Sequence, residues 1–170
     1  MSALMKGLVV AAIQVLLVAS VGAKYLYDRG HYPHVWVETV PYDPDLPIRG
    51  RYVRIAVLVD AERTATRGAP ADSGTPAMFM GRLEVKDQRL VAIEDNDGRH
   101  WVSARSCGGK PCWQLAEPLA YFISERVQDP SRRPVGESLW VEVTVPPKGA
   151  PRPVQLGVKK KGRLVPLELN

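Results

Sequence analysis

An unbroken apolar run near the N-terminus is the strongest feature of the pattern. Residues 7–23 read GLVVAAIQVLLVASVGA, in which Gln14 and Ser20 are the only clearly polar side chains. A membrane-spanning helix needs ~20 apolar residues, with a range of ~17–25. A helix packed on a soluble core would instead show a polar face. The pattern therefore predicts that residues 7–23 insert into a lipid bilayer.

The anchor can be retained or removed. An uncleaved signal anchor over residues 7–24 is favoured, and the alternative is a signal peptide cleaved after Ala23, where small residues suit a signal peptidase. A short basic tail, residues 1–6, followed by a long translocated domain is typical of an N-terminus-in arrangement. We therefore expect a single-pass protein of the inner (cytoplasmic) membrane. Residues 25–35 would form a linker and residues 36–170 an extracytoplasmic β-rich domain.

The rest of the chain alternates between apolar and polar positions over short runs, which predicts strands. The predicted strands cover residues 36–40, 52–59, 79–85, 90–94, 100–104 and 139–145, with a terminal hairpin of residues 153–159 and 163–169. The apolar run within 52–59 indicates burial on both faces. Turn residues at 86–89 and 95–98 predict a meander between residues 79 and 104. Residues 119–124 fit either a strand or one helical turn.

Composition supports many short elements over long helices. The 170 residues include 15 prolines and 14 glycines, spread along the chain, and three prolines between residues 41 and 47 preclude regular structure there. The predicted fold class is all-β, a mainly antiparallel small barrel or sandwich, with one N-terminal transmembrane helix.

Two segments carry a family resemblance. Residues 43–57, DPDLPIRGRYVRIAV, resemble the signature of the GDYXXLXY proteins, a family of membrane-anchored bacterial proteins. In that signature a proline-rich turn is followed by R-G-D-Y and alternating apolar residues. Here Gly50 and Tyr52 match and Ile55 replaces the leucine, whereas Arg51 replaces the aspartate and Val57 the last tyrosine.

A second segment, residues 121–125, is similar to the family's Y-F-V-P-E motif through Tyr121, Phe122 and Glu125. The closing residues 162–167 fit the family's C-terminal hairpin, so the order of anchor, motifs and hairpin agrees along nearly the whole chain. The resemblance implies a membrane location and a β architecture. It implies no activity. Gly50 stands between the proline-rich turn and a buried strand, where we expect a positive φ.

The chain has two cysteines, Cys107 and Cys112, which enclose Gly-Gly-Lys-Pro. In an oxidising compartment such a pair is expected to close a disulfide over the turn, with Cα atoms ~4.4–6.8 Å apart. We also expect Trp113 to pack beside it. The spacing is not the C-x-x-C of redox enzymes, and zinc would need four ligands.

Other chemistry lacks the residues it would need. The first 24 residues hold two of the 23 basic residues and no acid, which leaves the domain with 21 basic and 18 acidic residues, too mild an excess for a nucleic-acid surface. His31 and His34 lack the H-E-x-x-H helix of metalloproteases. Residues 95–98 fit an Asx turn better than a calcium loop, because position twelve of such a loop would be Ser106. No cofactor, metal site or catalytic motif is predicted.

Two functional hypotheses remain. The favoured one is a non-enzymatic, membrane-anchored accessory or interaction domain of the cell envelope, with the lipid bilayer and an integral membrane protein as partners. The alternative is an extracytoplasmic enzyme or ligand-binding domain with an unrecognised pocket. The basic cluster of residues 159–163 is interpreted as a solvated hairpin tip, with anionic lipid or polymer binding as the alternative.

Overall fold

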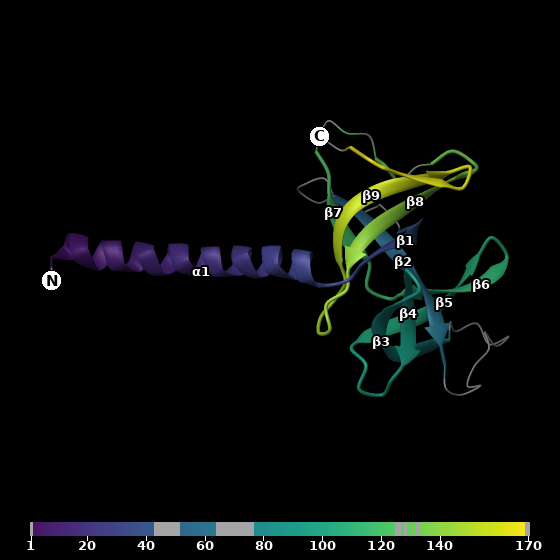
Figure 1. Cartoon of the computed structure of the whole chain (residues 1–170), viewed down its shortest axis with the longest axis horizontal. Coiled ribbons are helices and arrows are strands. Elements are labelled where there is room, and N and C mark those ends of the chain that lie inside the picture. The colour runs from purple at the N-terminus through teal and green to yellow at the C-terminus, as the bar shows by residue number, and fades with distance from the viewer. Residues whose placement is uncertain are drawn as a thin grey trace. The chain divides into compact units, whose positions relative to one another are not determined.

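The N-terminal segment is one long helix. In a computed structural model, which describes residues 2–42, 52–63, 77–124, 127, 129–131 and 133–168, helix α1 spans Ala3–His31 (Figure 1). Its N-cap is Ser2, whose side chain accepts a hydrogen bond from the Met5 backbone N–H. The helix ends at His31, because the ring of Pro33 disfavours helical geometry in the residue that precedes it, Tyr32. Tyr32 is accordingly extended, with φ −87° and ψ 151°.

Most of the predicted linker, residues 25–35, has regular secondary structure. The helix continues to His31, and the first strand begins at His34. Nothing in residues 24–31 breaks a helix before Pro33, so propagation continues past the apolar run. The stretch Leu4–His31 is long and apolar enough to cross a membrane. At ~1.5 Å per residue the 29-residue helix is about 44 Å long, which exceeds the ~30 Å hydrocarbon core of a bilayer.

Residues 33–170 form a second compact unit, which is all β. Its strands are β1 His34–Pro41, β2 Tyr52–Glu62, β3 Met78–Lys86, β4 Arg89–Glu94, β5 His100–Cys107, β6 Lys110–Leu115, β7 Leu119–Phe122, β8 Glu137–Thr144, β9 Arg152–Lys160 and β10 Arg163–Pro166. Among the described strands β2 and β4 pair in parallel and the other pairs are antiparallel. The predicted fold class, mainly antiparallel all-β with an N-terminal apolar helix, is confirmed.

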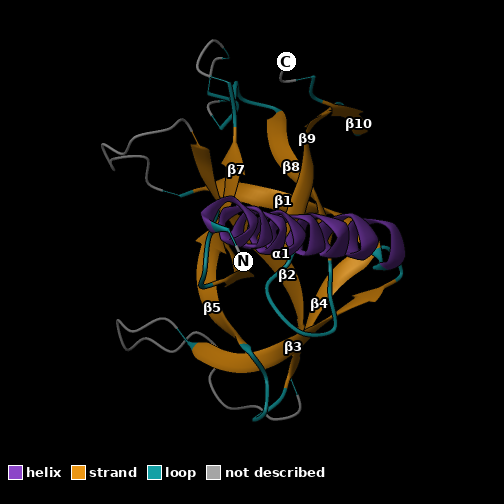
Figure 2. Ribbon diagram, turned by 90° about the vertical axis from the view of Figure 1, so that its left-hand side faces the viewer, coloured by secondary structure: helices purple, strands orange, loops and turns teal. Residues whose placement is uncertain are grey.

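The long strand β2 belongs to two groups of strands. Its first half pairs with β1 and β7, and the sheet continues in the order β7-β2-β1-β8-β9-β10. Its second half pairs with β6 and β4, and the order β2-β4-β3-β5-β6-β2 returns to its start as a five-stranded barrel. Figure 2 shows the two groups, β7 to β10 at the top and β3 to β5 at the bottom, with β1 and β2 between them.

Sharing one strand explains the burial pattern of β2. Ile55, Ala56 and Val57 are consecutive and all buried, as the apolar run predicted, because this part of β2 has neighbours on both faces. A core of mostly β-branched side chains joins the two groups. Its members include Val37, Ile55, Val57, Phe79, Leu90, Val102, Val141, Val143 and Leu156.

The predicted meander is wrong in its order. β4 and β5 are joined by the turn at residues 95–98, but they do not pair, because β3 lies between them. Asp95 instead accepts from Gly98 in a turn that carries the chain across β3. Within the segment 119–124, which fits either a strand or one helical turn by pattern, residues Leu119–Phe122 form strand β7. Strand β6 was not predicted, since Lys110 and Pro111 at its start are residues that strands disfavour.

Candidate functional site

The two family-like motifs lie side by side although they are far apart in the chain. β7 pairs antiparallel with the start of β2, and this register sets Tyr52 opposite Phe122. The centroids of these two rings are 6.1 Å apart at a tilted angle. Gly50, with its expected positive φ, and Glu125 lie outside the described residues. The part of each motif that the structure describes therefore forms one continuous piece of sheet.

The motif residues divide into inward and outward sets. Ile55 is fully buried and Tyr121 packs partly buried against the core, so both support the fold. Phe122 is 78 % exposed, although a phenylalanine ordinarily seeks burial. The guanidinium carbon of Arg54 lies 5.9 Å from the centroid of the Tyr52 ring. We call Tyr52, Arg54 and Phe122 the aromatic patch. It offers apolar area, one cation and one hydroxyl to a partner.

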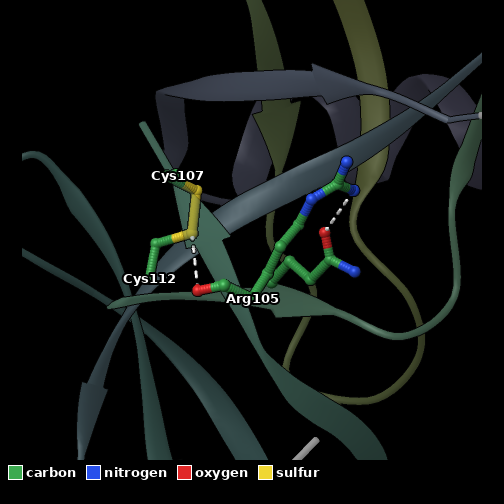
Figure 3. The surroundings of a disulfide bond; sticks show 4 residues. Arg105, Cys107 and Cys112 are labelled. Atoms are coloured by element: carbon green, nitrogen blue, oxygen red, sulfur yellow. Dashed lines mark hydrogen bonds between the residues drawn. A yellow bond between two sulfur atoms is a disulfide. The ribbon is translucent and has the colours of Figure 1, made fainter. Parts of the chain in front are cut away.

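The β5–β6 hairpin carries the predicted cysteine pair (Figure 3). Gly108 and Gly109 form its turn with φ of 59° and 82°, a left-handed geometry that glycine adopts without strain. Cys107 and Cys112 are bridged, and their Cα atoms are 5.8 Å apart, within the expected range. The Sγ atom of Cys112 lies 3.4 Å from the carbonyl oxygen of Arg105 on the neighbouring strand. The bridge therefore fixes the hairpin tip.

Trp113 does not pack beside the disulfide. Successive side chains of a strand point to opposite faces, so Trp113 turns inward where Cys112 turns outward. Its ring packs edge-on against Phe79 at a centroid distance of 5.2 Å. The Arg63 guanidinium lies 5.3 Å from the Trp113 ring and 5.5 Å from the Phe79 ring, and its Nε is 3.7 Å from a carboxylate oxygen of Glu94. This cluster stabilises the barrel where β2 and β4 end.

An open groove of about 640 Å³ lies between the β1–β8–β9 face and two hairpins of the barrel. The triplet Trp-Val-Glu occurs twice in the chain, beginning at Trp36 and at Trp140. Because β1 and β8 pair antiparallel, Trp36 lies opposite Glu142 and Trp140 lies opposite Glu38. The valines between them point into the core. The outward face therefore carries two tryptophans on one diagonal and two glutamates on the other.

The walls of this groove come from the barrel. On one side the β3–β4 hairpin lies beside β2, with which β4 pairs, and Arg89 Nη1 is 3.4 Å from Asp60 Oδ2 in an exposed ion pair. On the other side stand Pro111 and Cys112 of the disulfide hairpin. The bridge thus fixes one wall of the groove as well as its own turn. Acceptor oxygens, one guanidinium and aromatic surface face a common space.

The basic cluster of residues 159–163 is only partly a solvated tip. Lys161, in the turn, is exposed. Lys159 Nζ lies 4.5 Å from the Trp140 ring centroid, a cation–π contact at the edge of the groove. Lys160 Nζ lies 2.7 Å from Glu137 Oε1, which forms a cross-strand ion pair. The Glu137 carboxylate offsets one positive charge of the cluster, which reduces what the cluster can offer to an anionic lipid or polymer.

A small cavity of about 70 Å³ lies beside His100, between the start of β5 and the segments at Glu117 and Ala150. Burial lowers the pKa of His100, which disfavours the imidazolium form. The Glu117 carboxylate and a hydrogen bond to the Gly149 backbone act in the opposite direction. His100 is therefore held mainly neutral, at a junction of three segments.

The remaining patterns have local roles. His31 Nδ1 lies 2.9 Å from the carbonyl oxygen of Tyr27, one helical turn earlier, and the two rings stack. Its companion His34 begins β1, and no group of three or more metal ligands gathers among the described residues. The Asp97 N–H donates to the Asp95 side chain at 3.0 Å, so the Asx turn predicted there is confirmed.

The groove was missed at the level of sequence. Its one visible signal is the repeated Trp-Val-Glu triplet, which becomes meaningful only when the two copies pair across the sheet. Comparison with known protein families, curated proteins and solved structures found no match. The aromatic patch, the disulfide hairpin and the groove are therefore judged by their own chemistry.

Proposed function

We propose that this chain is a single-pass protein of the inner membrane whose β domain stands on the extracytoplasmic side as a non-enzymatic accessory or interaction domain. The observation that carries the proposal is the apolar surface of α1. Leu16, Leu17 and Val18 are 68 %, 63 % and 74 % exposed, in a run of exposed apolar side chains along the helix. Soluble proteins rarely leave such a continuous apolar surface in water, and a bilayer buries it.

The short connection after the helix favours a partner in the same membrane. Two residues, Tyr32 and Pro33, separate α1 from β1 in the chain, so the tether between helix and domain is short. Tyr25 and Tyr27 follow the apolar run, together with Lys24, in the order typical of a membrane interface. A domain tethered this closely reaches the extracytoplasmic surface of an integral membrane protein more readily than a distant soluble one.

Membership of the GDYXXLXY family is part of this proposal. Its support is that the two motif segments pair as neighbouring strands and leave the aromatic patch at the surface. We infer that this patch contacts the integral membrane partner, because exposed aromatic residues and arginine are the residue types that contribute most to protein interfaces.

Two measurements test the proposal. Alkaline phosphatase fused to the C-terminus is active only outside the cytosol, so the full chain should give an active fusion and a chain lacking residues 1–24 an inactive one. Crosslinking in native membranes should then yield a conjugate with an integral membrane protein. Phe122→Ser should abolish that conjugate, whereas Val165→Ser, which changes a 51 % exposed residue on β10, should leave it intact. An inactive full-length fusion, or equal conjugates in the two variants, would contradict the proposal.

The groove favours a second candidate, an extracytoplasmic ligand-binding domain. Its volume of about 640 Å³ falls within the ~300–1,000 Å³ range of small-molecule sites, and aromatic surface meets polar groups in it. The two functions are compatible, because the groove and the aromatic patch use different side chains.

A further inference from the structure

Trp36 and Trp140 form the floor of the groove, and contacts within the protein hold both side chains in place. The Trp36 ring extends across the sheet and lies against Gly157 of β9. A Cβ atom added to Gly157 would stand only 2.8 Å from Cζ3 and 3.1 Å from Cη2 of the Trp36 indole. Glycine at this position lets the ring lie against the backbone. The Trp140 indole N–H donates to Ser138 Oγ at 2.9 Å. Two large apolar rings are thus held in place, which lowers the entropy cost of binding to them.

The polar rim of the groove is rich in hydrogen-bond acceptors. Glu38 lies opposite Trp140 in the β1–β8 register, and its carboxylate has no hydrogen-bond or ion-pair partner within the part of the chain that the structure describes. Asp60 and Asp87 line the groove as well. Ionised carboxylates only accept hydrogen bonds. A ligand that satisfies this rim must bring several donors of its own.

The charges in the groove nearly balance, which argues against a strongly charged ligand. Three carboxylates, those of Glu38, Asp60 and Asp87, face two cations, Arg89 and Lys159. Arg89 already pairs with Asp60, and Lys159 lies over the Trp140 ring. With three carboxylates beside them, these two cations do not give the groove the excess of positive charge that phosphate or another polyanion requires.

The same geometry disfavours a peptide. Strand addition needs an unpaired sheet edge, but the strands of the floor lie inside the sheet, with β1 between β2 and β8 and β8 between β1 and β9. A proline-rich peptide presents carbonyl acceptors and few N–H groups, so it needs donors from the groove. The Trp140 N–H, one of the donors at the groove, is taken by Ser138, and the three carboxylates that line the groove cannot donate to those carbonyl oxygens.

We propose that the groove binds a neutral oligosaccharide. The apolar C–H faces of sugar rings would stack on Trp36 and Trp140, and the hydroxyl groups would donate to the carboxylates of Glu38 and Asp60. The disulfide hairpin supplies a rigid wall through Pro111. This inference rests on the ligand-binding candidate proposed above for the same groove, and it does not depend on the orientation of the anchor.

The test uses the full-length chain in micelles of a polyoxyethylene ether detergent, since the sugar headgroups of maltoside or glucoside detergents would compete. Chitotetraose, cellotetraose and maltotetraose are titrated by calorimetry, and deca-proline is titrated as the peptide arm. We expect saturable binding of at least one tetrasaccharide and no binding of deca-proline. Trp140→Ala should weaken that binding by ~10-fold or more, as expected for a buried aromatic contact.

Two further variants separate recognition from folding. Glu38→Gln keeps the shape of the side chain and removes the charge, so it should weaken the same binding roughly five- to tenfold, as expected when a charged acceptor is replaced by a neutral one. Trp101→Ala is the matched control, because this tryptophan is 51 % exposed and does not line the groove. It should leave the affinity unchanged. Circular dichroism checks that each variant is folded.

Several results would overturn the proposal. They are the failure of all three tetrasaccharides to bind at millimolar concentration, binding of deca-proline in their place, and unchanged sugar affinity in Glu38→Gln. If Trp140→Ala does not fold, the Glu38→Gln and Trp101→Ala titrations decide alone. Loss of affinity in Trp101→Ala but not in Glu38→Gln would place the sugar elsewhere on the domain.

Discussion

Substitution of Gly157 by alanine tests how the groove floor is built. The new Cβ would stand 2.8 Å from Cζ3 of Trp36 and 3.2 Å from the Val165 carbonyl oxygen. Carbon atoms in contact normally lie ~3.5–4.0 Å apart, so the indole must move by roughly 1 Å. Overpacking of this kind costs ~1–3 kcal/mol, and replacing glycine returns ~0.4–1 kcal/mol through the unfolded chain. We therefore expect Gly157→Ala to lower the free energy of unfolding by about 1–2 kcal/mol.

A double-mutant cycle identifies the cause. Thermal unfolding of the full-length chain is followed by far-ultraviolet circular dichroism, which does not depend on the tryptophan signal. With Trp36→Leu as the background, the clash with the indole is absent and only the 3.2 Å approach to the Val165 carbonyl oxygen remains, so Gly157→Ala should cost much less than in the wild-type background. An equal loss of stability in both backgrounds would refute the argument, because the strain would then come from the backbone and not from the indole.

Three other predictions concern the rest of the molecule. Burial lowers the pKa of His100, so the unfolded chain binds a proton at this residue more readily than the folded chain, and the free energy of unfolding should fall as the pH drops below about 6.5. Urea unfolding between pH 8 and 5 should show a weaker dependence of stability on pH in His100→Asn than in the wild type. Identical pH profiles in the two proteins would contradict this prediction. Ile55→Ala should cost ~2–5 kcal/mol, whereas Phe122→Ser should stay within ~0.5 kcal/mol, and similar losses in both would show that the exposed ring supports the fold. The full-length chain should sediment with membranes and a chain lacking residues 1–24 should be soluble; a full-length chain found only in the cytosol would refute the anchor.

Local patterns in the sequence were enough to find most strands. Strands such as β8 alternate so regularly that apolar burial alone defines them, and the run around Ile55 correctly indicated burial on two faces. The length of α1 was underestimated because hydropathy marks only the part suited to lipid. Helix propagation continues through polar residues until Pro33 stops it.

Local patterns did not predict which strands pair with one another across the chain. The turn at residues 95–98 has good hairpin chemistry, yet β3 lies between β4 and β5, since sheet order depends on contacts that local sequence does not encode. The groove also depends on which strands pair and in which register. Trp36 and Trp140 become neighbours only through the register of β1 and β8, and the gap left by Gly157 is visible only once β9 is in place.

The central claim is that the β domain lies outside the cytosol, and the state of Cys107 and Cys112 in the cell tests it most directly. Cells are quenched in acid, the protein is denatured, and thiols are alkylated with and without prior reduction. Because disulfides persist in extracytoplasmic compartments and thiols in the cytosol, the full-length chain should take up no label before reduction and two labels after it. The chain lacking residues 1–24 is the control and should label fully without reductant. Labelling of both cysteines in the unreduced full-length chain would contradict the bridge and the extracytoplasmic location together.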